Sequence, residues 1–216
     1  MKSITETNKE MVVKQKKILN TRALTVIGML SALAAVLMLF QIPLWFAPSF
    51  YEVDLSEVPI LIGAFALGPL AGIMAELVKI LLNLIFNGTK TAGVGELANF
   101  IMGCSLVVPS AIIYKRRKSR KTAYLGMIIG ILTMVIVASL LNAYVLLPVY
   151  AKAFGMPLEG IIGFGTAVNP SINNLSTFIL FAVMPFNLIK GIVVAVVTGL
   201  LYNKISPIIK AIARHE

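Results

Sequence analysis

Two side chains suited to ligand contact, Asn187 and Lys190, lie inside an apolar run from about Phe178 to Leu201. As a helix rising about 1.5 Å per residue, such a run can cross a hydrocarbon core of about 30 Å. An ammonium in the middle of that span costs at least about 2.5–3.5 kcal/mol, so it should face protein or water. The two residues are three apart and share one helix face, and Pro185 loosens the backbone one turn earlier. Either Lys190 neutralises a carboxylate on a neighbouring helix, or this face is one wall of a binding site.

Other polar side chains recur at helical spacing in the remaining apolar runs. Glu76 and Lys79 are three residues apart and can pair, which favours a structural role for them. Glu96 opens another predicted helix, where stabilisation by the helix dipole competes with ligand contact as an explanation. Further amide and phenol groups in the outer halves of predicted helices are Asn99, Asn142 and Tyr144.

Catalytic motifs are absent from the sequence. The one histidine is His215, near the end of the chain, and there is no HExxH, Walker A or paired-carboxylate motif. No base-and-orienter arrangement accompanies a Ser or Lys nucleophile, and the single cysteine, Cys104, is interpreted as a packing residue. No metal site or catalytic residue is therefore predicted. Amides, a lysine and apolar walls suit a largely neutral, flat or polyol-bearing ligand.

Composition defines the class of protein. Of the 216 residues 58% are hydrophobic, and the mean hydropathy is +0.92, which indicates an integral membrane protein. The formal charge is +10, and 15 of the 19 Lys and Arg lie in residues 1–22, 115–121 and 204–214. These clusters flank apolar spans, as the positive-inside rule requires, and can attract anionic membrane lipid. Exposed aromatics interleaved with basic residues are missing, so nucleic acid is not an expected partner.

The predicted fold is all-α: a bundle of six transmembrane helices with both termini cytoplasmic. The spans are placed at residues 23–45, 58–67, 70–86, 96–114, 122–147 and 178–204. Residues 1–22 form a predicted cytoplasmic arm, 23–205 the membrane domain and 206–216 a basic cytoplasmic tail. A loop of residues 48–58 should cover the outer mouth of the bundle, and residues 148–174 form a long outer connection. The charged residues expected outside or at the outer surface are Glu52, Asp54, Glu57, Lys90, Glu96, Lys152 and Glu159.

Three segments resemble those of a known family. Residues 51–59 (YEVDLSEVP), 95–103 (GELANFIMG) and 185–191 (PFNLIKG) are similar to segments of the riboflavin-specific S components of energy-coupling factor transporters. The resemblance covers about residues 22–205. It implies a multi-pass protein of the bacterial cell membrane that binds riboflavin from outside, with no other cofactor. It also implies partners: a transmembrane coupling subunit and two cytoplasmic ATPase subunits.

The resemblance nominates residues around the ligand and on the partner surface. The substrate-binding set is Asp54 and Leu55 in the loop, Glu96 and Asn99, Asn142, and Asn187 and Lys190. A protein carboxylate is expected to balance the charge of Lys190, and Glu96 is one candidate for it. The family docks through an Ala-x-x-x-Ala stripe of its first helix, and here that register is Ser31-x-x-x-Ala35, flanked by Gly28 and Ala32. Such small-residue stripes allow another helix to approach closely.

Two alternatives remain open at this point. The same scaffold can serve another vitamin or a phosphorylated flavin. From a different class comes a membrane-embedded enzyme that uses Lys190 or Glu96, which turnover of a substrate by the isolated chain would reveal.

Overall fold

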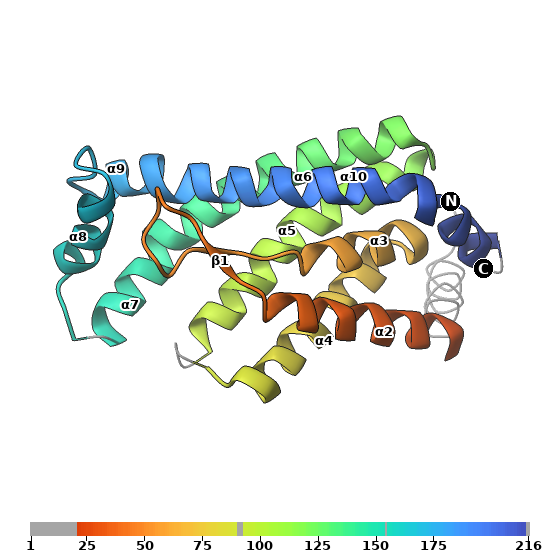
Figure 1. Cartoon of the computed structure of the whole chain (residues 1–216), viewed down its shortest axis with the longest axis horizontal. Helices are drawn as coiled ribbons and strands as arrows, with labels where there is room; N and C mark the ends of the chain where they lie inside the picture. Colours follow the sequence, from red (N-terminus) through yellow and green to blue (C-terminus); the bar gives the residue numbers. More distant parts are fainter. Residues whose placement is uncertain (1–20, 90–92, 154, 215–216) are drawn as a thin grey trace, which may run out of the picture.

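The computed structural model describes residues 21–89, 93–153 and 155–214, and most of them lie in helices packed as one elongated bundle (Figure 1). The elements in order are α2 (Thr21–Met38), β1 (Ile42–Pro43), β2 (Glu52–Val53), α3 (Glu57–Leu67), α4 (Pro69–Asn87), α5 (Val94–Arg116), α6 (Arg120–Leu141), η1 (Asn142–Leu146), α7 (Leu147–Ala153), α8 (Leu158–Val168), α9 (Leu175–Phe178), η2 (Ile179–Val183) and α10 (Met184–Arg214). Residues 1–20 of the predicted arm lie outside the described part.

Five helical stretches among the described residues are long and apolar enough to cross a membrane. They are Thr21–Met38, Pro69–Asn87, Val94–Arg116, Arg120–Ala153 and Leu175–Tyr202. The helices α3 and α8 are shorter, with 11 residues each. The predicted all-α membrane bundle is therefore confirmed in its class.

The first helix ends earlier than predicted. It stops at Met38 instead of Trp45, although the chain stays apolar beyond it. Pro43 cannot donate to a helix and pushes Ile42 into an extended conformation. β1 consequently pairs antiparallel with β2, with Ile42 opposite Val53.

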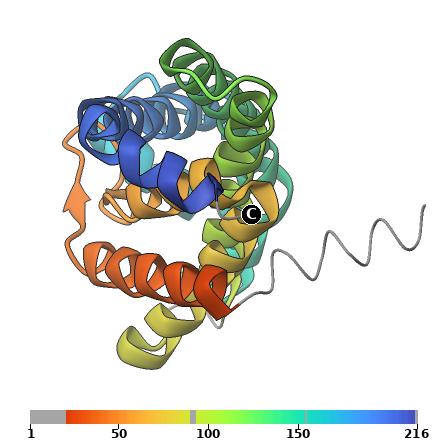
Figure 2. The same cartoon turned by 90° about the vertical axis from the view of Figure 1, so that its right-hand side faces the viewer.

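The extended segment of residues 39–56 leads from the end of α2 to the start of α3. In Figure 1 it runs towards α9, turns, and returns to α3, which begins about midway along the bundle. Seen from the end in Figure 2, α3 lies at the centre of the bundle, where it packs against α2, α4, α5 and α10. The N-terminal end of α3 therefore lies inside the protein.

The predicted outer connection of residues 148–174 is also wrong in its form. The helix of α6 continues through η1 and α7 to Ala153, and α8 follows. The glycines of this region suggested a loop, but six of the 11 residues of α8 are hydrophobic, and the helix packs into the second core cluster through Ile161 and Ile162. At the other end, α10 continues beyond Lys204 to Arg214.

Capping residues and small residues fix the helix ends and the close crossings. Ser119 caps α6 by accepting a hydrogen bond from the Thr122 N–H at 3.3 Å. Gly126 lets α6 approach α5, because a Cβ there would lie 2.6 Å from the Ser110 carbonyl oxygen. The start of α2 and the end of α10 lie at the same end of the bundle, opposite α8 (Figure 1).

Candidate functional site

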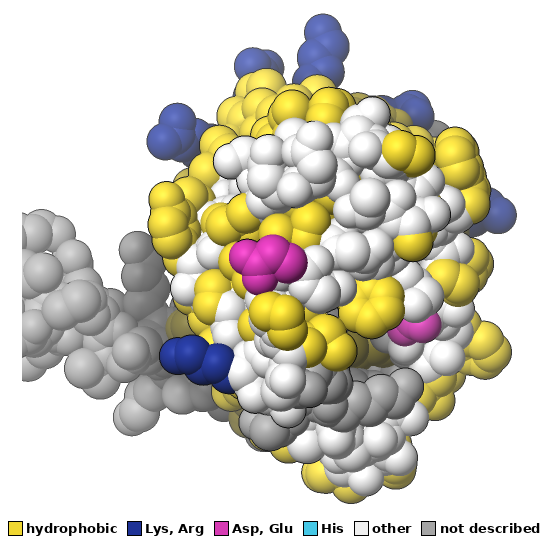
Figure 3. Space-filling view, turned by 90° about the vertical axis from the view of Figure 1, so that its left-hand side faces the viewer, with side chains coloured by type: hydrophobic (Ala, Val, Ile, Leu, Met, Phe, Trp, Pro, Cys, Tyr) yellow, Lys and Arg dark blue, Asp and Glu magenta, His cyan; other side chains and the backbone are white. Residues whose placement is uncertain are grey.

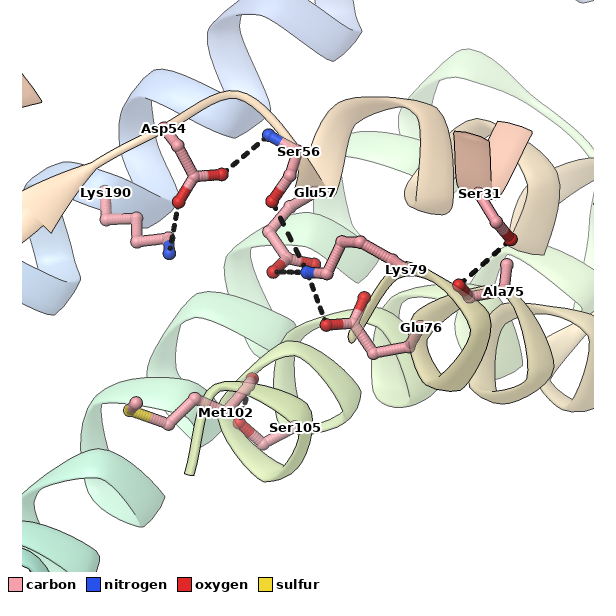
Figure 4. A network of polar contacts seen from close by, with 10 residues as sticks. All are labelled: Ser31, Asp54, Ser56, Glu57, Ala75, Glu76, Lys79, Met102, Ser105 and Lys190. Carbon is pink, nitrogen blue, oxygen red and sulfur yellow. Dashed lines mark hydrogen bonds and ion pairs between the residues drawn. The ribbon is translucent and has the colours of Figure 1, made fainter. Parts of the chain in front are cut away.

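A buried ion pair joins the extended segment to α10. Lys190 Nζ lies 3.1 Å from Asp54 Oδ2, and the two side chains are 12% and 1% exposed. The other oxygen, Oδ1, accepts the Ser56 backbone N–H at 2.8 Å. Figure 4 shows Asp54 between Lys190 and the first residues of α3. The loop carboxylate therefore anchors the segment to the helix that carries Lys190.

The surroundings of Asp54 keep it ionised. Burial alone would raise its pKa, but the nearby ammonium groups of Lys190 and Lys79 and the hydrogen bonds to Ser56 outweigh this and lower the pKa to about 2. The positive end of the α3 dipole acts in the same direction. Asp54 is thus a fixed negative charge at neutral pH.

A second contact ties the same segment to η1. Tyr51 donates its phenol hydrogen to Asn142 Oδ1 at 2.6 Å, and Asn142 Nδ2 donates to the Ala138 carbonyl at 2.8 Å. Burial raises the pKa of Tyr51, with a smaller contribution from Tyr150, so the phenol stays a neutral donor. Its ring centroid lies 4.9 Å from that of Phe186 on α10. In the sequence Tyr51 stands out only as part of the segment of residues 51–59, and nothing there indicates this contact.

The segments η1 and η2 are π-helical, which means that each turn is wider than in an α-helix. Each of them lies just before a proline, in the two helices that carry Asn142 and Asn187. η1 ends two residues before Pro148, and η2 ends two residues before Pro185. In each, the N–H after the π-segment bonds five residues back, Leu147 to Asn142 and Met184 to Ile179. Such π-turns move carbonyls away from a proline ring and are frequent at functional sites.

The two π-segments lie against each other and present the two predicted amides. η1 contacts η2; Asn142 opens η1, and Asn187 follows η2 by one turn. Asn187 Nδ2 donates to the Val183 carbonyl at 2.9 Å. Both side chains are buried, at 2% exposure each. The sequence predicted this convergence but not its cause in the π-segments.

The other residues predicted to bind the ligand are less buried than the two amides. Glu96 and Asn99 lie at the start of α5 and are half-buried, as is Leu55, which packs against the core. The prediction that Glu96 pairs with Lys190 is wrong, because Lys190 pairs with Asp54. Tyr144 is 77% exposed and does not converge with the amides.

A second charged cluster lies deeper, between α3 and α4. Lys79 Nζ lies 2.9 Å from Glu57 Oε1 and 2.5 Å from Glu76 Oε1, and all three side chains are at most 1% exposed. The predicted pairing of Glu76 with Lys79 is confirmed. The prediction that Glu57 lies at the outer surface is wrong, because the early end of α2 and the extended segment carry the start of α3 into the bundle. Lys79 also donates to Ser56 Oγ at 3.3 Å, which links this cluster to Asp54 (Figure 4).

The end of the molecule that carries α8 has both hydrophobic and charged side chains on its surface. Figure 3 shows hydrophobic side chains interspersed with other groups over this end, acidic side chains among them, and basic side chains towards the edges of the view. Within the described residues no group of three or more His, Cys, Asp or Glu could hold a metal ion. A fixed ion pair, two buried amides and aromatic rings can orient a neutral planar or polyol ligand through hydrogen bonds and stacking.

The predicted docking stripe on the first helix is split between two faces. Ser31 and Ala35 are 0% and 5% exposed, and the Ser31 hydroxyl bonds the Ala75 carbonyl of α4 at 3.0 Å. Gly28 and Ala32, by contrast, are exposed. The Ser31-x-x-x-Ala35 register is therefore internal. The sequence could not distinguish the two faces because small residues occupy both.

Comparison with known proteins defines the class. The model of the substrate-specific component of ECF transporters matches residues 22–202, and a solved S component of a bacterial ECF transporter has a TM-score of 0.67. That structure shares 38% sequence identity with this chain, over 87% of this chain and 96% of the other. The chain belongs to the family of ECF transporter substrate-specific components, and it is a multi-pass membrane protein.

Three relatives of this chain are riboflavin transporters. It is 40% identical to the riboflavin transporter RibU of Staphylococcus aureus, over 89% of this chain and 94% of that protein. It is 35% identical to the riboflavin transporter FmnP of Bacillus subtilis, over 88% and 94%. It is 32% identical to RibU of Lactococcus lactis, over 84% and 91%.

Proposed function

We propose that this protein is the riboflavin-binding subunit of an ECF-type vitamin uptake transporter and that it catalyses no reaction itself. The observation that carries the proposal is the buried Asp54–Lys190 pair, together with the buried amides of Asn142 and Asn187, in a chain 40% identical to a riboflavin transporter. Riboflavin presents a flat ring system, carbonyl oxygens and a polyol chain. Amides, an ammonium and aromatic rings match these groups.

The binding set is Asp54, Leu55, Glu96, Asn99, Asn142, Asn187 and Lys190. Because Asp54 already balances its charge, Lys190 acts towards riboflavin as a hydrogen-bond donor. The aromatic rings of Tyr51 and Phe186, 4.9 Å apart, add an apolar wall. Tyr51 holds the loop to Asn142, so exchange of the ligand requires the loop to move.

The membrane arrangement that fits this role has six crossings with both chain ends in the cytoplasm. The five long stretches supply five crossings, and α3 together with the extended segment before it supplies the sixth. The basic loop of residues 115–121 then lies inside by the positive-inside rule. Riboflavin enters from outside, at the end that carries α8.

Transport requires partners, because the chain has no nucleotide-binding motif. A transmembrane coupling subunit and two cytoplasmic ATPase subunits supply the energy. Reconstituted alone with ATP inside vesicles, the chain should bind riboflavin without accumulating it. Concentrative uptake by the chain alone would contradict this part of the proposal.

Purification in detergent followed by mass spectrometry of the bound small molecule tests the substrate. The expected result is riboflavin, and titration of the ligand-free protein should give a dissociation constant in the nanomolar to micromolar range, or about −8 to −12 kcal/mol. Recovery of another vitamin or of a phosphorylated flavin would keep the scaffold and replace the substrate. Chemical conversion of riboflavin by the pure chain would favour the membrane-embedded enzyme.

A further inference from the structure

The cluster between α3 and α4 contains one carboxylate too many. The connected groups in Figure 4 include two ammonium groups, Lys79 and Lys190, and three carboxyl groups, Asp54, Glu57 and Glu76. If all are ionised, one negative charge is left over inside the bundle. An uncompensated buried charge costs several kcal/mol, and in practice such a group takes up a proton instead.

Geometry identifies which carboxyl group is least well supported as an anion. Glu57 Oε1 accepts a hydrogen bond from Lys79 at 2.9 Å, and Glu57 opens α3, where the helix dipole favours a carboxylate. Glu76 lies in the interior of α4 at 0% exposure. Neither of its oxygens has a hydrogen-bond partner, although Oε1 is 2.5 Å from the Lys79 nitrogen.

The surroundings of Glu76 leave no room for further compensation. Gly103 of α5 packs directly on its carboxyl group, and a Cβ at Gly103 would collide with Oε1. The groups that face the cluster from neighbouring elements are the Cys104 thiol of α5, Asp54 of the extended segment and, beyond Asp54, Lys190 of α10. Beside Glu76, α2 contributes the Ser31 hydroxyl, which is bonded to Ala75. None of these supplies a second cation next to Glu76.

We infer that Glu76 is a proton-binding site: in the folded protein it holds one proton at neutral pH, donated into the space between the two glutamates. The proton makes the connected set of five groups neutral and lets α5 close on α4 at Gly103. It also preserves Lys79 as the partner of Glu57, so that Asp54 is left to pair with Lys190 in the ligand site. The inference concerns the ligand-free fold and does not depend on which vitamin is bound.

Infrared spectroscopy of the full chain in lipid nanodiscs tests this directly. The carbonyl stretch of a protonated carboxyl group is distinct from carboxylate and amide bands, and it shifts in D2O. We expect this band in the parent and its loss in Glu76→Gln. We also expect its loss in Glu57→Gln, because Glu76 then becomes the sole counter-ion of Lys79 and ionises. In Lys79→Met both acids should be protonated, and the band should grow. The exposed Glu159→Gln is the matched control and should leave the band unchanged.

Stability against pH gives an independent readout. The folded protein holds one proton more than the unfolded chain, so the parent should lose stability as the pH is raised above about 4. Glu76→Gln should remove that loss, so its melting temperature should match that of the parent near pH 4, the ordinary pKa of a glutamate being about 4.3, and exceed it at neutral pH. Absence of the band in the parent, or a band that survives in both Gln variants, would overturn the inference. The Gln variants carry the test even where Lys79→Met fails to fold.

Discussion

Lys190 serves the fold through Asp54 and is expected to serve the ligand through its remaining hydrogens. Replacing it with Met leaves Asp54 buried with only its Ser56 partner. We expect a loss of about 3 kcal/mol in stability, the lower end of the range for a broken buried pair, because Lys190 is 12% exposed. Riboflavin oxygens left unpaired should weaken binding by roughly ten- to a hundred-fold.

A double-mutant cycle separates the two roles. Asp54→Asn combined with Lys190→Met removes both charges, so stability should partly return while riboflavin affinity stays low. Thermal melting of the empty protein and riboflavin titration are measured on both single variants and the double variant. Lys152→Met, at an exposed position, is the control. Recovery of affinity in the double variant would show that Lys190 acts only on the fold.

Asp54 also sets an acid limit on the ion pair. Its folded pKa, lowered to about 2, lies below the unfolded value of about 3.9. The stabilisation is therefore fully present above about pH 4 and is lost as the pH falls towards 2, by about 2 kcal/mol in total. Chemical denaturation across that interval should show the loss in the parent and not in Asp54→Asn. An equal acid response in both proteins would place the titrating group elsewhere.

At this scale the sequence predicted contacts within one helix better than contacts between distant segments. Spacing placed Asn187 and Lys190 on one face and paired Glu76 with Lys79, because helical geometry fixes neighbours three residues apart. It assigned Glu96 to Lys190 and placed Glu57 outside, because contacts between distant segments depend on the path of residues 39–56. Hydropathy carries no information about that path.

At the scale of the secondary-structure element, the two π-segments that precede prolines position the side-chain amides of Asn142 and Asn187. Pro185→Ala restores an N–H that can donate to a carbonyl four residues back, and so favours a regular helix through residues 179–185. Loss of the extra residue that the π-turn accommodates would rotate the side chains that follow it by about 100° about the helix axis. We expect riboflavin affinity to fall at least about ten-fold, with unchanged helix content by circular dichroism.

Pro207 provides a matched control in the same helix. It lies inside α10, with no π-segment before it, and Pro207→Ala should bind riboflavin like the parent. Equal affinities in both variants would remove the π-segment from the binding mechanism. The sequence indicated a loosened backbone near Pro185. It did not predict η1, because Pro148 was interpreted as the end of a helix and not as a point where the helix widens and continues.

At the scale of the whole molecule, the proposed docking of partner subunits on the first helix requires a free surface on α2. Met29, Leu33 and Val36 are at least half exposed, at 69%, 50% and 52%, and Gly28 and Ala32 lie among them. A face with small residues four apart allows close approach of a partner helix. We propose this face, with Gly28 and Ala32, as the docking surface in place of Ser31 and Ala35.

Neighbouring positions on α2 make this assignment testable. Ala32→Leu adds bulk on the exposed face, so it should abolish co-purification with the coupling and ATPase subunits while riboflavin affinity and melting temperature stay at the parent values. Ser31→Leu adds the same bulk against α4 and removes the bond to Ala75, so it should cost about 1–3 kcal/mol of stability through overpacking. Loss of the complex in Ser31→Leu, without loss of stability, would return the docking register to Ser31 and Ala35. Because both variants introduce Leu into the same helix, general effects on membrane insertion cancel, and the difference reports which face the partner contacts.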